Sequence, residues 1–249
     1  MTVTSLVSTA LAEAWALVAP VDCAGCGAHD RALCPSCVAG LQSRLMRATL
    51  EVDGSSLPLV AALPYAGVAR RALLALKHEG RTELARPLAQ VLLAAVTAAW
   101  HGSGAELLVP VPGSRAAAAR RGFGPVALIT RRAGLAVTHA LRPVSAGPEQ
   151  KALRLEQRLA TDAGRWRASS RVSGRRVLLV DDVVTSGATL RAATRALRAA
   201  GAEVAGCAAM AAAVRRWGES SIHWEFFAVD DERHGDNEPV EDYREGKEA

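Results

Sequence analysis

The sequence predicts an α/β protein with an open, mostly parallel sheet and helices on both faces. Strand-like and helix-like patterns alternate along the chain from residue 58 onward, and this alternation is typical of parallel sheets. An apolar strand at 175–180 also runs directly into a turn and an amphipathic helix at 188–201. Open α/β sheets bind ligands at the carboxyl ends of such strands.

The spacing of apolar residues and the positions of glycine and proline define the expected elements. Between residues 38 and 111 we expect, in chain order, a helix near 38–50, a strand and turn at 58–67, helices at 68–80 and 82–100, and a strand at 106–111. A basic loop followed by a helix within 115–134 and a polar loop and helix at 145–166 come next. The central strand at 175–180 and the helix at 188–201 precede two final strands within 203–214 and 221–230.

Three parts of the chain differ in composition. Residues 1–50 contain a short amphipathic helix and a cysteine-rich module, and residues 51–229 contain the α/β domain. Residues 230–249 hold nine acidic and three basic side chains, which predicts a solvated, disordered acidic tail. Without that tail the chain carries a net charge of +11. A basic body favours an anionic partner such as phosphate, pyrophosphate or nucleic acid, unless arginine is simply common in this protein.

The sequence favours a cytoplasmic protein with no stable membrane insertion. No apolar run has the length needed to cross a bilayer. The apolar first 20 residues lack a basic leading segment and contain Glu13, whereas a signal peptide needs an initial positive charge and an unbroken apolar core.

Four of the five cysteines form two CxxC pairs separated by seven residues: Cys23, Cys26, Cys34 and Cys37. Four thiolates at this spacing predict a tetrahedral Zn²⁺ site. A disulfide, a redox role or an empty site are the alternatives. Because no ligand position is left open, the zinc would be structural and would hold together a segment too short to fold alone. Cys207 lies in an apolar run and is expected to be buried.

The segment 177–190 carries the functional signal of the α/β domain. Asp181 and Asp182 follow the apolar strand and would bind Mg²⁺ or sugar hydroxyls. The next turn would bind a phosphate through backbone amides at a helix N-terminus, with Gly187 allowing close approach. Its residues are Thr185, Ser186, Gly187, Ala188 and Thr189. A ribose phosphate needs both halves of this site.

Other interpretations of the segment fit less well. A Walker P-loop requires lysine after its last glycine, where Ala188 stands, and the GxGxxG fingerprint of dinucleotide sites is absent. An aspartyl phosphatase would separate its two aspartates by one residue. An acidic helix cap accounts for one such side chain but not for the whole run.

The stretch VLLVDDVVTSGATL resembles the phosphoribosyl pyrophosphate signature of type I phosphoribosyltransferases. The double CxxC motif, YAGVARRALLALKHEG, VPVPGSRAAAARRGFG and the pair Gln150 and Arg158 extend the resemblance to the ComF family, bacterial proteins linked to competence and DNA uptake. The resemblance differs at Gly124, where the family usually has Asn, and at Thr161 and Trp166, where it often has Asn and then an aromatic.

The resemblance implies roles for individual residues. Asp181 and Asp182 would bind the ribose hydroxyls, directly or through Mg²⁺, and residues 185–189 would bind the 5′-phosphate. The remaining implied residues surround the pyrophosphate, either in its binding loop or in a mobile basic loop: Lys77, His78, Arg115, Arg120 and Arg121. Lys77 is also explained as a solvated lysine at a helix end, and the two last arginines as surface charge.

Two functions follow as hypotheses. The first is a phosphoribosyltransferase of nucleotide metabolism that binds phosphoribosyl pyrophosphate with Mg²⁺ and transfers phosphoribose to an acceptor. The second is an accessory factor in DNA uptake that binds single-stranded DNA and works with a competence helicase. The net charge supports the second hypothesis, whereas an aromatic content of 4% argues against strong base stacking.

Overall fold

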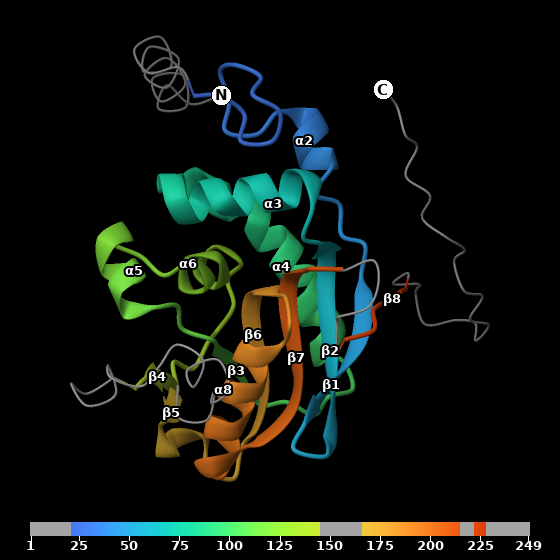
Figure 1. Ribbon diagram of the computed structural model, residues 1–249, viewed down its shortest axis with the longest axis vertical. Helices are drawn as coiled ribbons and strands as arrows, with labels where there is room; N and C mark the ends of the chain where they lie inside the picture. The colour runs from blue at the N-terminus through green and yellow to red at the C-terminus, as the bar shows by residue number, and fades with distance from the viewer. Residues whose placement is uncertain (1–20, 145–165, 215–221, 228–249) are drawn as a thin grey trace, which may run out of the picture.

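The computed structural model describes residues 21–144, 166–214 and 222–227 (Figure 1). Its main element is a six-stranded sheet in the order β3-β6-β7-β2-β1-β8. The pairs β3–β6, β6–β7 and β7–β2 are parallel, whereas β1 is antiparallel to both of its neighbours. These strands are β1 (Met46–Val52), β2 (Ser55–Pro64), β3 (Leu107–Pro110), β6 (Arg176–Val184), β7 (Glu203–Ala212) and β8 (Glu225–Phe226). The predicted mostly parallel sheet is confirmed.

Helices cover both faces of the sheet, as predicted (Figure 1). On one face α4 (Ala85–Trp100) packs on β2 and β7, with α6 (Pro125–Arg132) against it. The other face is covered by α8 (Ala188–Ala199). Each face has its own apolar core, with Leu88 on the first and Leu190 on the second. A fully buried leucine contributes about 1.5–3 kcal/mol to stability, so the two cores fix the helices to the sheet.

The predicted helix at 68–80 consists of two consecutive parts. The α-helix α3 (Gly67–Leu74) continues into a π-helical turn, Ala75–Glu79, which ends at Gly80. Figure 1 shows α3 lying across the end of the sheet toward which β6 runs. This turn therefore brings its polar side chains close to the carboxyl ends of the parallel strands.

The helix expected near 38–50 is wrong. A short helix, α2 (Pro35–Ala39), is followed by β1, whose burial alternates along Met46–Val52. Two residues, Asp53 and Gly54, both with positive φ, connect β1 to β2, which is a typical two-residue hairpin. The domain boundary proposed at residue 50 therefore falls within a strand of the main sheet.

Two further expectations about local structure are corrected. The basic segment expected as a loop is helix α5 (Arg115–Arg121), which begins where Ser114 Oγ accepts a hydrogen bond from the Ala117 amide. Trp166, expected in loop or helix, is the first residue of β5 (Trp166–Ala168), which forms a small antiparallel sheet with β4 (Leu141–Pro143). The final strand is confirmed only at Glu225–Phe226.

Several expectations concern residues outside the described ranges: the N-terminal helix within 1–20, Gln150 and Arg158, and the acidic tail at 230–249. Over the described ranges, none of the helices combines the length and the apolar character that crossing a bilayer requires.

Candidate functional site

The two candidate carboxylates lie within β6 rather than after it, because this strand continues to Val184 and not only to residue 180. It also lies second from the sheet edge, so it is not the central strand. Asp181 and Asp182 are 8% and 9% exposed. Since successive side chains of a strand alternate between faces, the two carboxylates point to opposite sides of the sheet.

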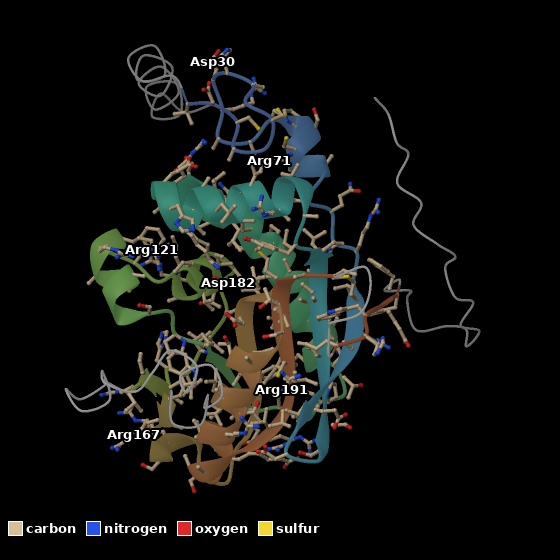
Figure 2. All side chains as sticks on the ribbon, viewed as in Figure 1. Asp30, Arg71, Arg121, Arg167, Asp182 and Arg191 are labelled. Atoms are coloured by element: carbon tan, nitrogen blue, oxygen red, sulfur yellow. The ribbon has the colours of Figure 1, made fainter. Side chains whose placement is uncertain are left out.

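The Asp182 side chain points toward the turn that follows α3. Its Oδ1 lies 2.9 Å from Lys77 Nζ, and the side chains of Lys77 and Asp182 are 24% and 12% exposed. Lys77 belongs to the π-helical turn after α3, and Figure 2 shows Asp182 below α3 and beside α6. Two residues predicted to serve different parts of one ligand therefore form a direct ion pair.

Asp181 faces the α8 side of the sheet. Burial raises the pKa of the Cys207 thiol to about 12, and the negative charge of Asp181 contributes to that shift. Cys207 belongs to the core between the sheet and α8, which confirms the predicted buried position of this cysteine. Asp181 Oδ1 also accepts a hydrogen bond of 2.8 Å from the backbone amide of Asp182. Asp181 therefore fixes the backbone at its neighbour while its own side chain faces the other core.

The predicted basic residues differ in their positions. Arg121 NH1 donates a 3.4 Å hydrogen bond to the Lys77 carbonyl, and Arg121 Nε is buried with no partner among the described residues. Arg120 and His78 are exposed, and their side chains form no ion pair or hydrogen bond with the described part of the chain. Arg115 begins α5. The structure thus brings Lys77, Asp182 and Arg121 together.

The predicted phosphate turn connects β6 to α8. Thr185 and Ser186 are exposed, and Gly187 has a φ of +76° at the N-cap of the helix. A Cβ atom at Gly187 would lie 2.6 Å from Leu50 Cδ1 and 3.0 Å from Ile222 Cδ1. Packing against the core thus requires glycine here, a reason different from the predicted approach of a phosphate. Ala188 and Thr189 follow in the first turn of α8.

Two arginines near the site are not identified by the sequence motifs. Arg191 contacts the phosphate turn, and Arg81 follows the turn that carries Lys77. Arg191 could have been proposed from the sequence, because it follows Gly187 by one helical turn. Arg81 could not, because its hydrogen-bond partner Asp22 lies 59 residues away in sequence.

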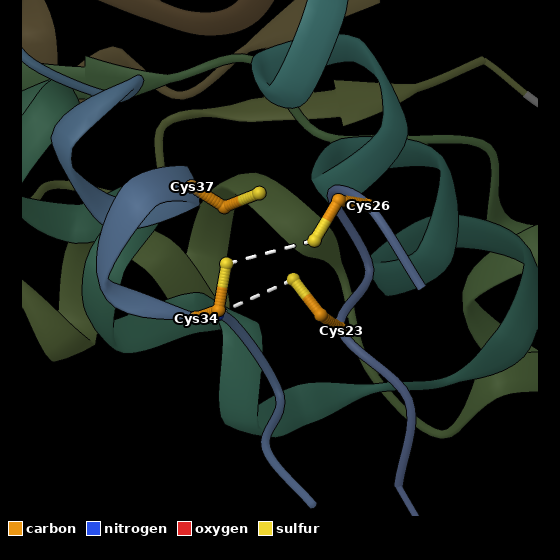
Figure 3. A group of neighbouring side chains, drawn as sticks. All are labelled: Cys23, Cys26, Cys34 and Cys37. Atoms are coloured by element: carbon orange, nitrogen blue, oxygen red, sulfur yellow. Dashed lines mark hydrogen bonds between the residues drawn. The ribbon is translucent and has the colours of Figure 1, made fainter. Parts of the chain in front are cut away.

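The four N-terminal cysteines converge (Figure 3). Their Sγ atoms all lie within 4.8 Å of one another, and those of Cys26 and Cys34 are 3.6 Å apart. Zn–S bonds of about 2.3 Å in a tetrahedron place sulfurs about 3.8 Å apart. A Cβ atom on Gly25 would collide with Cys37 Sγ, so only glycine fits beside the cluster. The geometry fits a zinc site with four cysteine ligands.

The thiols of the cluster differ in acidity. Burial opposes ionisation of Cys23, but backbone hydrogen bonds, including those from Cys34 and Gly25, outweigh it and lower its pKa to about 6. Burial and the neighbouring sulfurs raise the pKa of Cys37 to about 12. Because thiolates are the metal ligands, zinc binding would release protons from the cluster.

The cysteine cluster packs directly on the segment that carries Lys77. Val68 of α3 contacts the buried cysteines. At the other end of this segment, Arg81 NH1 donates a 2.7 Å hydrogen bond to the Asp22 carbonyl, next to the first cysteine. Both ends of the segment from Val68 to Arg81 are therefore held by the cysteine module.

These features define the class of protein: a mostly parallel α/β fold whose strand β6 leads two aspartates into a turn that caps the following helix. The chain belongs to the phosphoribosyl transferase domain family, whose model matches residues 117–241. That match begins in α5 and includes all of β6, the turn and α8.

Two similar proteins illustrate the match. A 33-residue segment is 70% identical to an orotate phosphoribosyltransferase of Nocardioides sp. (strain ATCC BAA-499 / JS614), covering 13% of this chain and 18% of the relative. The solved structure of an allosteric regulatory enzyme of purine biosynthesis aligns with 20% identity and a TM-score of 0.36, covering 55% of this chain and 30% of that one. The aligned regions thus span less than a third of either relative.

Proposed function

We propose that the protein is a phosphoribosyltransferase that binds phosphoribosyl pyrophosphate with Mg²⁺ at the carboxyl edge of its sheet. One observation carries the proposal. Strand β6 presents the Asp182 carboxylate to Lys77 at 2.9 Å and continues directly into the Gly187 turn at the start of α8. The carboxylate, the cation and the helix N-terminus match, in this order, the ribose hydroxyls, the pyrophosphate and the 5′-phosphate of this ligand.

Each part of the ligand has a proposed partner. Backbone amides of residues 185–189 bind the 5′-phosphate, and Asp182 binds the ribose hydroxyls, directly or through the metal. Asp181 holds the backbone at Asp182 in place from the opposite face. Lys77 and Arg121 bind the pyrophosphate, because Lys77 lies next to Asp182 and Arg121 has a buried N–H group without a partner among the described residues. A buried guanidinium N–H needs an acceptor, which a pyrophosphate oxygen supplies.

In the proposed reaction, the bond between the anomeric carbon and the pyrophosphate oxygen breaks, and its electron pair leaves with pyrophosphate. A nitrogen of the acceptor forms the new bond to that carbon, and its proton passes to the departing pyrophosphate. The positive charges of Lys77 and Arg121 stabilise the departing pyrophosphate, and the negative charge of Asp182 stabilises the electron-poor ribose. Bound Mg²⁺ would supply further neutralisation of the pyrophosphate.

Calorimetry tests the proposal. The wild-type chain should bind phosphoribosyl pyrophosphate in the presence of Mg²⁺, and Asp182→Asn should weaken binding by about tenfold or more. Asp53→Asn, at the tip of the β1–β2 hairpin, where the carboxylate pairs with Arg195 and not with Lys77, is the control and should bind normally. Absence of binding by the wild-type chain would contradict the proposal, as would equal affinities of the wild-type chain and Asp182→Asn.

We also propose that Cys23, Cys26, Cys34 and Cys37 hold one structural Zn²⁺. The convergence of the four sulfurs and the position of Gly25 support this assignment. The assignment leaves no position for a reacting water, because four thiolates complete a tetrahedral shell. Metal analysis of the purified protein should find one zinc per chain, and Cys26→Ser should lower that content.

A further inference from the structure

We infer that Arg191 is a positioning residue for the 5′-phosphate turn, although it does not itself contact the phosphate. The inference rests on the proposed function, because it assigns the phosphate to residues 185–189. Arg191 lies in the first turns of α8, where its backbone amide donates to the Gly187 carbonyl at 2.9 Å. Its guanidinium points back toward residues 185–187, which precede the helix.

Arg191 connects the turn to the neighbouring hairpin. Its NH1 donates a 2.7 Å hydrogen bond to the Ser186 carbonyl, and its Nε donates a 2.9 Å hydrogen bond to the Glu51 carbonyl of β1. Figure 2 shows Arg191 on the side of α8 that faces the β1–β2 hairpin. Because both acceptors are backbone oxygens, the guanidinium fixes the path of two chain segments 135 residues apart in sequence.

The contact with Ser186 determines which way the turn presents its amides. In a trans peptide the carbonyl and the following N–H point in opposite directions. Arg191 holds the Ser186 oxygen on its own side, so the Gly187 N–H points away from the guanidinium. Loss of that contact would remove one restraint on the peptide between Ser186 and Gly187, and rotation of this peptide would turn a carbonyl toward the phosphate in place of the amide.

Packing around Gly187 also restricts the peptide between Ser186 and Gly187. A Cβ atom here would meet Leu50, Ile222 and Arg191 NH1, at 2.6, 3.0 and 3.4 Å. The turn is thus held against β1 at two consecutive residues, by an apolar contact at Leu50 and by the arginine at Glu51. A turn that is ordered before the ligand arrives loses less entropy on binding, and this increases affinity.

The charge of Arg191 is unfavourable for the helix alone. Cations stabilise helix C-termini, and the first turn of α8 contains no acidic residue. A positive charge placed there does, however, favour an anion bound at the turn.

Arg195 provides a matched control. One turn further along α8, its Nε and NH2 donate to the Asp53 carboxylate at 3.0 and 2.8 Å. It ties the same helix to the same hairpin, but through the hairpin tip instead of the phosphate turn. Replacing either arginine by methionine removes one tether of α8, and only the replacement of Arg191 releases the Ser186 carbonyl.

The test compares Arg191→Met, Arg191→Lys and Arg195→Met by calorimetry with Mg²⁺ and three ligands. These are phosphoribosyl pyrophosphate, ribose 5-phosphate and pyrophosphate. Arg191→Met should weaken the two ligands that carry a 5′-phosphate about tenfold and change pyrophosphate affinity less than about twofold. Arg191→Lys, which reaches one carbonyl but not both, should give an intermediate loss. Arg195→Met should leave all three affinities within about twofold.

Several outcomes would overturn the inference: unchanged ribose 5-phosphate affinity in Arg191→Met, an equal loss in Arg195→Met, or an equal loss for pyrophosphate. If Arg191→Met does not fold, the lysine variant carries the comparison. Failure of the proposed function is distinguishable, since the wild-type chain would then bind none of the three ligands. If the wild-type chain binds them and Arg191→Met binds them equally well, only the positioning role is contradicted.

Discussion

Lys77 Nζ lies 2.9 Å from Asp182 Oδ1, although 105 residues separate the two in sequence. Both side chains are less than a quarter exposed, so each would lose favourable interactions if its partner were removed. Because the pair joins the turn after α3 to β6, it links the proposed pyrophosphate partner to the proposed ribose partner. Binding of a metal or a ribose at Asp182 would compete with Lys77 for the same carboxylate.

The Lys77–Asp182 pair should contribute measurably to stability. Lys77→Met leaves a mostly buried carboxylate without its partner and should lower the free energy of unfolding by about 1–3 kcal/mol. In a double-mutant cycle with Asp182→Asn, the coupling energy from urea denaturation should exceed about 0.5 kcal/mol. The exposed pair Arg175–Glu106, with a 2.6 Å contact, is the control and should couple more weakly. Equal coupling in the two pairs would contradict the prediction.

The sequence allowed the sheet class, α8 and the turn that joins β6 to α8 to be predicted, because each depends on local periodicity or on a local motif. It did not allow the Lys77–Asp182 contact to be predicted, since that contact depends on the strand order. Asp181 and Asp182 were expected to serve the same site. They lie on opposite faces because β6 continues beyond residue 180, and how far a strand extends depends on pairing with its neighbour, here β7.

Two of the errors in local structure have a clear physical origin. Residues 46–52 combine good helix formers with a period-two burial pattern, and pairing with β2 decides in favour of the strand. In α5 the arginines suggested a loop, but the alanines between them favour a helix. The expected DNA and helicase partners rest on charge and resemblance, and they stay predictions.

Gly187→Ala should be more destabilising than the same change at Gly122. The two glycines have φ angles of +76° and +77°, so a side chain meets the same backbone strain, about 1–2 kcal/mol, at both positions. Only at Gly187 would the new methyl group also collide with the core, which adds about 1–3 kcal/mol. Urea denaturation of the two variants measures the difference. Equal destabilisation would mean that the Leu50 and Ile222 side chains move aside without cost.

Removal of the proposed zinc ion should loosen the segment that carries Lys77. Val68 packs on the cysteine cluster and Arg81 donates to the Asp22 carbonyl, so chelation should increase hydrogen exchange in residues 68–81 as well as in 23–40. Strands β6 and β7 form the interior of the sheet and should keep their protection. Exchange in 68–81 that is independent of metal would contradict the coupling. Thiol titration of the metal-free protein should detect the four clustered cysteines, with Cys207 reacting only after unfolding.

The ion pair at the tip of the β1–β2 hairpin should make stability depend on pH. The hydrogen bonds from Arg195 hold the pKa of Asp53 below its usual value of 3.8. A carboxyl group with a lowered pKa in the folded state stabilises the protein above the unfolded value, and this contribution is lost as the pH falls through the folded value. The difference in Tm between the wild-type chain and Asp53→Asn should therefore be constant from pH 7 to about pH 5 and disappear in stronger acid. Arg195→Met should give the same profile, because it removes the other partner. A difference that persists in acid would instead assign the effect to the conformation of Asp53, whose φ is +51°, and not to its charge.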